Sequence, residues 1–431
     1  MSHARFREEV QGHPVWGGEL VTHFGADGAL LVINGRYIPV ASDLGQAAKS
    51  ADEARVLAVD AARQANPALS PDAFTTYAPK LYAYPVDAQT VKLAWRVQMD
   101  VVDDTTDSVY ETFVDAGDGS VLHTVELTQY LDGSGVGVFG DSQKLVVAPN
   151  GASYILEDAT RGMPPTRTYS AGARVRLPGT AVRSKDAAHW DEAGDAHGAA
   201  VDAHAFVAVA WDYFASVHGR AGWDDKGKGI HTTVHFGRSY ANAFFNGKQL
   251  AFGDGDGTSY APLSGALDVV AHEYTHGVTF HSAHLGVEGQ NGALNEAISD
   301  IFGCFIAGTW TIGAAVYHPL GRHHAIRDVA QPHGSNNPAT MAEYVGTSDD
   351  NGGVHVNSTI VSHAAYAMTT GAHALPRLTV EKIWYRALTR YLHARADFAD
   401  AADATVASAR DLGGDAETTV REAWVAAGVL Q

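Results

Sequence analysis

The sequence predicts an α+β protein in which strands dominate the chain before residue 281 and helices dominate it afterwards. Three observations lead to this fold class. Short apolar runs separated by turn residues fill most of the first 185 residues. The segments around 269–276 and 292–307 carry apolar residues at helical spacing. The rest of the chain has the same periodicity, and further helices are expected at 356–370, 379–392, 399–412 and 415–427.

The first 128 residues are predicted to form two small pieces. Residues 1–45 are rich in hairpin signals, and Asp27-Gly28 and Asn34-Gly35 are expected to be turns. Residues 46–128 begin with a helix at 49–65, which Ser50 and Glu53 can cap, followed by strands near 80–85, 92–101 and 108–115. Neither piece holds a persuasive catalytic cluster, so we expect a folding or inhibitory module.

A change of composition after Gln129 marks the start of the larger part of the chain. Residues 129–281 are predicted to form a β-rich lobe, with one amphipathic helix at 199–218. Residues 282–431 are predicted to form a helical lobe. Its loop-rich stretch holds four histidines that lack the close spacing of metal ligands, so we expect them to be solvated: His318, His323, His324 and His333.

Composition limits the classes of partner. The formal net charge of -19 argues against nucleic acid or an anionic membrane as the main partner. No run of 18 apolar residues is present, and Cys304 cannot form an internal disulfide, so it is expected to pack as a small hydrophobe. We expect a monomer. The first residues lack the apolar core of a signal peptide, so either a signal has been removed or export does not use that route.

The sequence His272-Glu273-Tyr274-Thr275-His276 points to metal chemistry. Histidines four residues apart lie on one face of a helix and can share one metal ion. Glu273 points about 100° around the helix from His272, where a general base can take a proton from water on the metal. A chain with 22 histidines can contain this pattern by chance, so a third ligand is required.

The third ligand is predicted on the helix at 292–307. Glu296 and Asp300 lie one turn apart on a mostly apolar helix, where acids are costly unless they are paired or bind a metal. We assign Glu296 as the third zinc ligand and Asp300 as the acceptor that orients a ligand histidine. The alternative is a pair of solvated acids on a surface helix.

These motifs resemble the thermolysin family of zinc metalloendopeptidases, with the propeptide still attached. The resemblance rests on the H-E-x-x-H motif, on 292–300 at the expected distance, on 349–358 and on Asn242-Ala243-Phe244. It covers nearly the whole chain and implies a two-lobe catalytic unit, with a β-rich N-terminal lobe and an α-helical C-terminal lobe. Residues 1–45 resemble the fungalysin/thermolysin propeptide, and 46–128 resemble a PepSY-type module.

The resemblance also implies roles for individual residues. His272, His276 and Glu296 would bind one catalytic Zn²⁺, and Glu273 would activate water. His355, oriented by Asp350, would donate to the oxyanion. Asn242 and the backbone of Ala243 would hold the peptide as an added strand, and Arg327 would bind its carbonyl on the leaving-group side. The pocket for the residue after the scissile bond would be apolar and would use Tyr260, Leu263, Val269, Ile312, Val316 and Ile326, which implies cleavage before Leu, Phe, Ile or Val.

Two positions depart from the family pattern. The family's second oxyanion donor is a tyrosine, and Val287 stands in its place. Loss of one such donor costs about 3 kcal/mol of transition-state stabilisation. The family's double calcium site keeps Asp268, but its later positions fall on Ala307, Thr309, Thr311 and Ala314, so this site is predicted to be absent. Acids near Asp191 and Asp195 leave open a single calcium ion.

The resemblance therefore implies a proenzyme that acts on proteins and peptides. Its own propeptide would serve as intramolecular chaperone and inhibitor, with autocleavage between about 122 and 133. Secretion is expected, with a cytoplasmic location as the alternative. Two other readings stay open: a latent zinc protein with a binding role, and a processing peptidase with one dedicated substrate.

Overall fold

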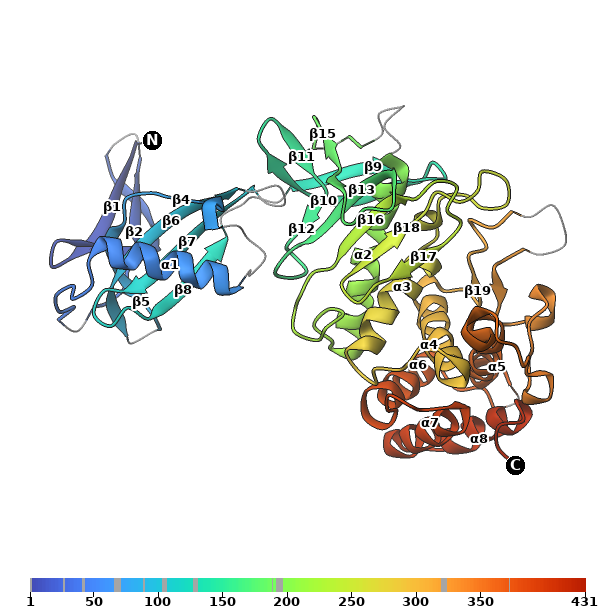
Figure 1. Ribbon diagram of the computed structural model, residues 1–431. Coiled ribbons are helices and arrows are strands. Elements are labelled where there is room, and N and C mark those ends of the chain that lie inside the picture. The colour runs from blue at the N-terminus through green and yellow to red at the C-terminus, as the bar shows by residue number, and fades with distance from the viewer. Residues whose placement is uncertain are drawn as a thin grey trace. The chain divides into compact units, whose positions relative to one another are not determined.

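The computed structural model describes the chain except for residues 1, 26–27, 41–42, 66–70, 88–89, 103–106, 127–130, 188, 191–196, 319–323 and 372. The chain forms two compact units, Met1–Gln129 and Tyr130–Gln431 (Figure 1). Each unit is described by itself below. The finer division of the first unit at residue 45, and of the second at residue 281, stays a prediction.

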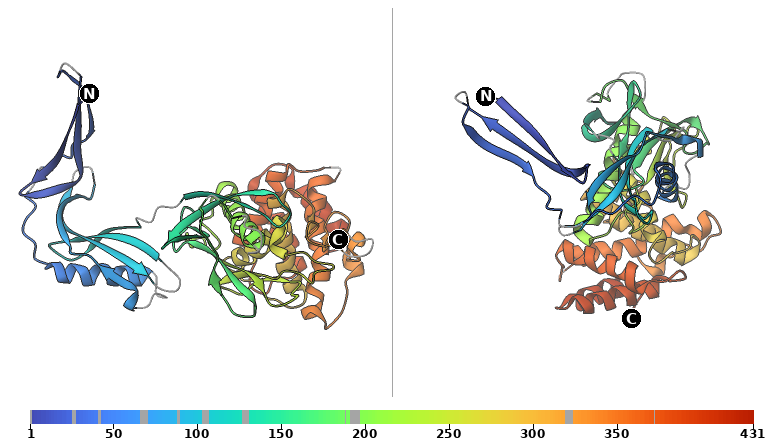
Figure 2. Two further views of the ribbon diagram at one scale, coloured as in Figure 1. Left: turned by 90° about the horizontal axis from the view of Figure 1, so that it is seen from above. Right: turned by 90° about the vertical axis from the view of Figure 1, so that its left-hand side faces the viewer.

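The first unit is a sheet with one long helix. Its strand order is β1-β2-β5-β6-β7-β8, with β3 beside β2 and β4 beside β6. The predicted cap is present at the start of α1, where the side chains of Ser50 and Glu53 each accept a hydrogen bond from the other residue's backbone N–H. Ala54 and Ala58 of this helix pack on the sheet. Strands β1 to β3 form the part of the sheet that extends away from α1 (Figure 2). The elements are β1 (Ser2–Val10), β2 (His13–Phe24), β3 (Leu30–Arg36), α1 (Ala51–Ala65), β4 (Phe74–Thr76), β5 (Lys80–Pro85), β6 (Val91–Val102), β7 (Asp107–Asp115) and β8 (Val121–Glu126).

One predicted turn in this unit is wrong. Asn34 and Gly35 lie inside β3, paired with Val21 and Leu20 of β2, rather than at a hairpin turn. Gly35 has φ of 130°, and a Cβ at this position would collide with the backbone oxygen of Glu19. The glycine therefore allows close approach of two strands, which the dipeptide alone does not distinguish from a turn. Asp27, in the other predicted turn, lies outside the described residues.

The second unit begins with two sheets and a buried helix. One sheet has the order β15-β11-β10-β9, and the other has the order β12-β13-β16-β18-β17, with β14 beside β13. Helix α2 packs against strands of both sheets, and β17 is an edge strand. The elements are β9 (Leu131–Val136), β10 (Ser142–Asn150), β11 (Ser153–Ile155), β12 (Glu157–Asp158), β13 (Thr166–Arg174), β14 (Thr180–Ala181), β15 (Arg183–Ser184), α2 (His197–His218), β16 (His231–Phe236), β17 (Ala243–Phe245) and β18 (Gln249–Phe252).

The remainder of the second unit is helical. The two-stranded ladder of β19 (Thr311–Ile312) and β20 (Arg327–Asp328) interrupts it. The predicted helix at 356–370 begins earlier because Asn351, Gly352 and Gly353 adopt left-handed conformations that join a short first turn to the main helix. The predicted helix at 379–392 is α6 followed by a π-helical turn. The elements are α3 (Leu267–Phe280), α4 (Gly289–Ala307), α5 (Asp350–Thr370), α6 (Arg377–Arg386), the π turn (Ala387–Tyr391), α7 (Phe398–Leu412) and α8 (Ala416–Ala426).

Helices α3 and α4 lie at the centre of one continuous apolar core. Val270, Tyr274 and Val278 on α3 are fully buried, as are Leu294 and Ile298 on α4. Cys304 is buried and has no disulfide partner, as expected. Among the described helices, none is long and apolar enough to cross a membrane. Because both central helices are fixed by core packing, polar side chains on their remaining faces have defined positions.

Candidate active site

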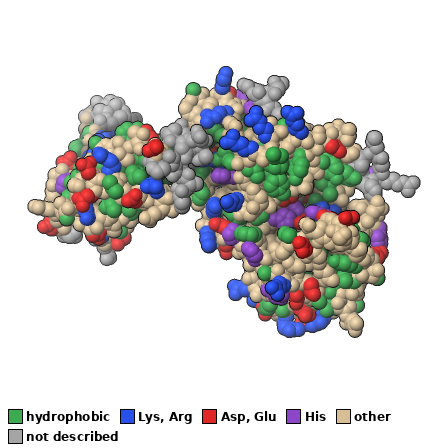
Figure 3. Space-filling model, in the orientation of Figure 1, with side chains coloured by type: hydrophobic (Ala, Val, Ile, Leu, Met, Phe, Trp, Pro, Cys, Tyr) green, Lys and Arg blue, Asp and Glu red, His purple; other side chains and the backbone are tan. Residues whose placement is uncertain are grey.

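A cleft of about 780 Å³ opens in the second unit, between the edge strand β17 and helices α3, α4 and α5. Figure 3 shows histidine side chains gathered in the hollow of this unit. The cleft is lined by all three predicted metal ligands and by Glu273, Asp350 and His355. The catalytic residues predicted from separate parts of the sequence therefore meet in one place.

His272 and His276 on α3 converge with Glu296 on α4. The Nε2 atoms of the two histidines are 3.1 Å apart, and they lie 3.3 and 3.5 Å from carboxylate oxygens of Glu296. Potential ligand atoms of these three residues lie within 4.8 Å of one another. Glu296 Oε2 is buried without a hydrogen bond from the described residues. Two imidazoles and one carboxylate at this spacing fit a divalent metal ion with an open coordination position.

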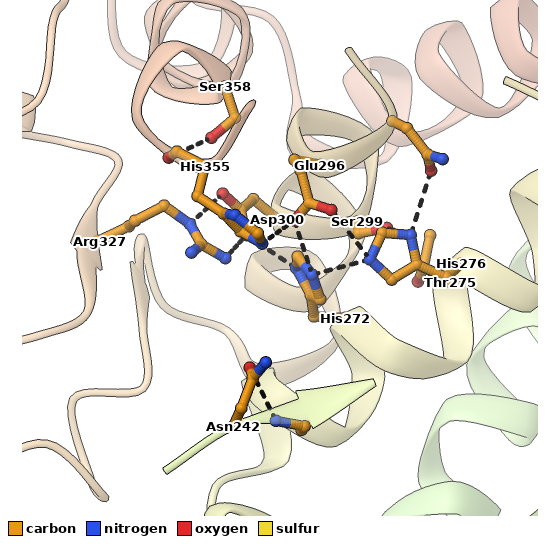
Figure 4. A network of polar contacts seen from close by, with 12 residues as sticks. Asn242, His272, Thr275, His276, Glu296, Ser299, Asp300, Arg327, His355 and Ser358 are labelled. Carbon is orange, nitrogen blue, oxygen red and sulfur yellow. Dashed lines mark hydrogen bonds and ion pairs between the residues drawn. The ribbon is translucent and has the colours of Figure 1, made fainter. Parts of the chain in front are cut away.

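The far sides of the two rings are held by hydrogen bonds (Figure 4). His272 Nδ1 lies 2.8 Å from Asp300 Oδ1, and His276 Nδ1 lies 3.1 Å from Asn295 Oδ1. Because these oxygens only accept, each Nδ1 donates, and in the neutral form of each ring Nε2 keeps its lone pair toward the other two side chains. The predicted role of Asp300 as an orienting acceptor agrees with this contact.

The pKa values of two members of the ligand group, His272 and Glu296, are strongly shifted. Burial opposes protonation of His272, but the hydrogen bond to Asp300 and the nearby carboxylate of Glu296 outweigh it and raise its pKa to about 10. Burial also acts on Glu296, yet His276, His272 and His355 hold the pKa of its carboxyl well below its usual range. The protein therefore stabilises one positive charge at this point, which a metal ion can supply in place of a proton.

Arg327 makes a contact that the sequence did not reveal. Its Nε and Nη2 donate to the two oxygens of Asp300 at 2.7 and 2.6 Å, and both residues are buried. Arg327 also lines the cleft, and within the described part of the chain its Nη1 makes no hydrogen bond. The arginine thus fixes Asp300 and also contributes to the wall of the cleft.

Glu273 follows His272 on α3 and lines the cleft beside the ligand group. Its carboxyl is buried, and burial raises the pKa above its usual value. A carboxyl with a raised pKa exchanges protons near neutral pH more readily than an exposed one. This position suits a group that takes a proton from water and later passes it to another atom.

His355 approaches the ligand group from α5. Its Nδ1 donates to Asp350 Oδ1 at 2.6 Å, and its backbone N–H donates to Asp350 Oδ2 at 2.9 Å. Its Nε2 lies 3.3 Å from Glu296 Oε2 and faces the cleft. The left-handed turn at Asn351 to Gly353 folds Asp350 back under the ring of His355, so the pair is preorganised.

The predicted substrate residues form the opposite wall. Asn242 lies across the cleft from His272, and its side-chain oxygen accepts from Ala243 N–H at 3.0 Å (Figure 4). The outer edge of β17 has no partner among the described strands. Five of the six predicted pocket residues line the cleft: Tyr260, Leu263, Val269, Ile312 and Ile326. Val316 differs from the prediction, because it is fully buried behind this wall and does not line the cleft.

The two departures from the family pattern have clear structural settings. Val287 lines the cleft with 65% of its surface exposed, and its side chain has no donor to offer. Asp268 is buried and accepts from Gly313 N–H at 3.0 Å, and burial raises its pKa to about 6. The predicted absence of the double calcium site stays a prediction. Asp191 and Asp195 lie outside the described residues, as does His323.

Sequence reasoning missed the partners of His276 and of Asp300. Asn295 and Ser299 flank Glu296 on the same helix, and both lie 3.1 Å from His276 Nδ1. Their one-turn spacing on α4 was a usable signal. Arg327 comes from a distant two-residue strand, and no local pattern indicates its pairing with Asp300. His333, one of the loop histidines, contacts Glu343 at 2.9 Å on the surface.

Comparisons with known proteins agree with this site. Residues 132–280 match the thermolysin metallopeptidase catalytic domain, and residues 283–429 match the thermolysin metallopeptidase alpha-helical domain. Residues 1–37 match the fungalysin/thermolysin propeptide motif.

Individual relatives cover most of the chain. A bacillolysin of Brevibacillus brevis is 36% identical over 426 residues, which are 96% of this chain and 79% of the relative. A thermolysin of Alicyclobacillus acidocaldarius is 35% identical over 99% of this chain and 83% of its own length. Among solved structures, the precursor of protealysin from Serratia proteamaculans matches with a TM-score of 0.54 and 33% identity, covering 61% of this chain and 87% of that one. The chain therefore belongs to the thermolysin family of metalloendopeptidases and is a precursor that carries the family's propeptide motif.

Proposed function

We propose that the protein is a zinc endopeptidase that hydrolyses internal peptide bonds on the amino side of bulky apolar residues. The observation that carries the proposal is the convergence of His272, His276 and Glu296 beside Glu273 in the cleft. When bound there, Zn²⁺ makes water acidic near neutral pH and polarises the peptide carbonyl.

Glu273 would act as the general base. Its carboxylate takes a proton from the attacking water and passes that proton to the nitrogen of the departing amine. The raised pKa of Glu273 supports the first step, because a carboxylate whose conjugate acid is weaker accepts a proton more readily. His355 Nε2–H would donate to the developing oxyanion, and Asp350 supports the charge on the ring through the 2.6 Å contact.

The substrate would lie as an extended strand along β17. The side-chain NH₂ of Asn242 and the backbone of Ala243 offer hydrogen bonds to such a strand. Arg327 would donate to a substrate carbonyl on the leaving-group side. The five apolar lining residues listed above, which we call the leaving-side pocket, favour a large apolar side chain directly after the scissile bond.

The first unit would act as intramolecular chaperone and inhibitor until it is removed. We place autocleavage between about 122 and 133, a stretch that includes undescribed residues. Release to the extracellular space is part of the proposal, with a cytoplasmic location as the alternative.

The test combines maturation with activity. Incubation of the full chain followed by N-terminal sequencing should yield a product that begins near residue 129, whereas E273Q should leave the precursor uncleaved. The matured protein should cleave casein, and a zinc chelator should abolish the cleavage. Unaided maturation of E273Q would refute self-processing, and the lack of chelator-sensitive cleavage by the matured protein would refute the endopeptidase.

A latent zinc protein is the second candidate, and Val287 is the observation that favours it. In that case the matured chain would bind zinc with the same three ligands but would not cleave casein. Metal analysis of the sample used for the activity assay separates the two candidates. A peptide-library profile would identify a dedicated processing peptidase by a single preferred sequence.

A further inference from the structure

The leaving-side pocket lies at the Asn242 end of β17. Gly253 N–H donates to Asn242 O at 3.0 Å, and Leu263, a member of the pocket, donates from its own N–H to Gly253 O at 3.0 Å. At the other end of the strand, the ring of Phe245 lies 6.1 Å from that of Phe280 at the end of α3. A substrate strand beside β17 would therefore leave the cleft past Asn242 with the residues that follow the scissile bond.

Three strands of the same sheet end at this place. β13, β16 and β18 run parallel to one another and β17 runs antiparallel to β18, so the ends of the first three lie on the same side of the sheet as the start of β17 (Figure 1). Arg174 is the last residue of β13, Arg176 follows on the connection to β14, and Arg238 follows the end of β16. Gly237 N–H donates to Arg174 O at 3.0 Å, so two of these strand ends are in direct contact. We call Arg174, Arg176 and Arg238 the arginine edge.

The three arginines are exposed and unpaired. Within the described part of the chain, none of their guanidinium groups forms a salt bridge or a side-chain hydrogen bond. Val175, which separates two of them, is 79% exposed, so this segment projects into solvent. The exposed arginines Arg410 and Arg421, by contrast, both contact Glu417. In a chain with a formal net charge of -19, three neighbouring cations without an acidic partner mark a local reversal of charge.

The acids at this end of the sheet already have other partners. Asp254, just after β18, lies 2.8 Å from His235 Nδ1. Asp256 accepts from three backbone N–H groups at 2.7 to 2.9 Å, and these hydrogen bonds lower the pKa of its carboxyl to about 2. Among the described residues, neither acid forms an ion pair with the arginine edge. The positive charge there is therefore available to an acidic group from outside the chain.

The spacing of the strands brings a bound peptide near this charge. Neighbouring strands lie about 4.8 Å apart, so a substrate beside β17 would be three spacings, or about 14 Å, from β16. The connection from Phe236 to Asn242 crosses from β16 toward β17 and carries Arg238. Residues of an extended peptide rise by about 3.4 Å each, so the third and fourth residues after the scissile bond lie about 7 and 10 Å beyond the first. Charges separated by about 10 Å, the Debye length in 0.1 M salt, still attract one another.

We propose that the arginine edge is a distal subsite that binds an acidic side chain at the third or fourth residue after the scissile bond. The inference rests on the proposed function and deepens it by naming a substrate class, which is peptides with a carboxylate downstream of the apolar residue in the leaving-side pocket. Guanidinium groups suit this partner because they donate two parallel hydrogen bonds to a carboxylate. Since the arginines are exposed, the attraction favours capture of the substrate and is weakened by salt.

The test uses quenched-fluorescence peptides and the matured enzyme. All peptides carry Leu directly after the scissile bond, and their third and fourth residues after it are Asp-Asp, Asn-Asn or Lys-Lys. In about 20 mM salt, kcat/KM for the Asp peptide should exceed that for the Asn peptide by about fivefold, through KM, and the Lys peptide should be slower than both. In about 0.5 M salt the advantage of Asp should fall below about twofold. Asp-Asp moved to the third and fourth residues before the scissile bond should give no advantage.

Two variants with the same change of net charge assign the preference to the arginine edge. R174Q/R176Q/R238Q should bring the ratio of kcat/KM for the Asp and Asn peptides to about one. K382Q/R390Q/R395Q removes three exposed cations from the helical part of the second unit, none of which lines the cleft. This control should keep the ratio at about fivefold. Thermal unfolding of both variants checks that each folds like the parent.

The outcomes separate this inference from the proposed function. Equal rates for the Asp and Asn peptides in low salt, or a preference that both variants keep or lose alike, would overturn the subsite alone. An equal advantage for Asp-Asp on either side of the scissile bond would show general steering by charge and would overturn it as well. Failure of the matured enzyme to cleave any peptide would overturn the proposed function and the subsite with it.

Discussion

Replacement of Asp300 by Asn tests how the buried polar group supports the metal site. Asp300 accepts two hydrogen bonds from Arg327 and one from His272, and it is fully buried. D300N keeps the volume of the side chain but removes its charge and replaces one acceptor oxygen with a donor. Arg327 would keep its charge without its partner, and one of the three hydrogen bonds would become a repulsive contact.

Two effects of D300N can be given magnitudes. Removal of one partner from a buried ion pair costs about 3–5 kcal/mol of folding stability, and an amide that still accepts two of the three bonds places D300N near the lower end. Replacement of the charged acceptor that would orient a ligand histidine lowers metal affinity by about 10- to 100-fold. D300N should therefore be both less stable and weaker in zinc binding.

The assays are denaturant unfolding and competitive zinc titration, both in an E273Q background that prevents autolysis. D411N is the matched control, because Asp411 accepts from Nε and Nη2 of Arg386 but lies on the surface. We expect D411N to change little in either assay, since exposed ion pairs contribute little. Zinc affinity of D300N equal to that of the parent would refute the orienting role of Asp300.

The remaining predictions concern the cleft, one remote acid and the metal. V287Y should raise kcat by up to about 100-fold if the tyrosine hydroxyl restores an oxyanion donor. V287F, which lacks the hydroxyl, should not raise kcat, and equal kinetics for the two variants would contradict the role of the hydroxyl. Asp202 is buried, and burial raises the pKa of its carboxyl to about 6. The folded state therefore binds the carboxyl proton more tightly than the unfolded chain does, and the free energy of unfolding falls as pH rises from about 4 to about 6. D202N should therefore be more stable than the parent at pH 8, by up to about 3 kcal/mol, with no gain below pH 4; unfolding curves at both pH values check it. Zinc at 100 times its dissociation constant should stabilise the folded state by about 2.7 kcal/mol relative to the protein in the presence of a chelator. Equal thermal unfolding with and without the chelator would show that the site does not bind the metal.

Local periodicity was sufficient to predict the elements that carry the proposed catalytic residues. The motif around His272 lies on α3 and Glu296 lies on α4, because apolar residues at helical spacing bury the other faces of both helices. Asn34-Gly35 shows the limit of such patterns. A glycine that permits close strand approach has the same sequence signature as one that permits a turn, and only the neighbouring strand distinguishes them.

Long-range pairing of side chains could not be predicted from the sequence, for a different reason. The contact between Arg327 and Asp300 joins residues 27 apart, across a connection that contains an undescribed segment. No periodicity relates a two-residue strand to the middle of a helix. Val316 illustrates the same limit, since its apolar character fits a pocket wall and a buried core equally well, and only packing decides between them.

The charges of the site explain why it suits a divalent cation. Three carboxylates, Glu273, Glu296 and Asp300, are in or beside the ligand group, and the guanidinium of Arg327, which contacts Asp300, adds one permanent positive charge. With neutral imidazoles and ionised carboxylates, this group carries two surplus negative charges. The upward shift in the pKa of His272 is a response of the metal-free protein to these carboxylates, because the proton that it takes up offsets one of the charges, whereas the pKa of Glu273 is raised by burial. A divalent metal offsets both charges without protonating His272 or Glu273, so its binding would release protons and leave the proposed ligand and the proposed base in the forms that the proposed function requires.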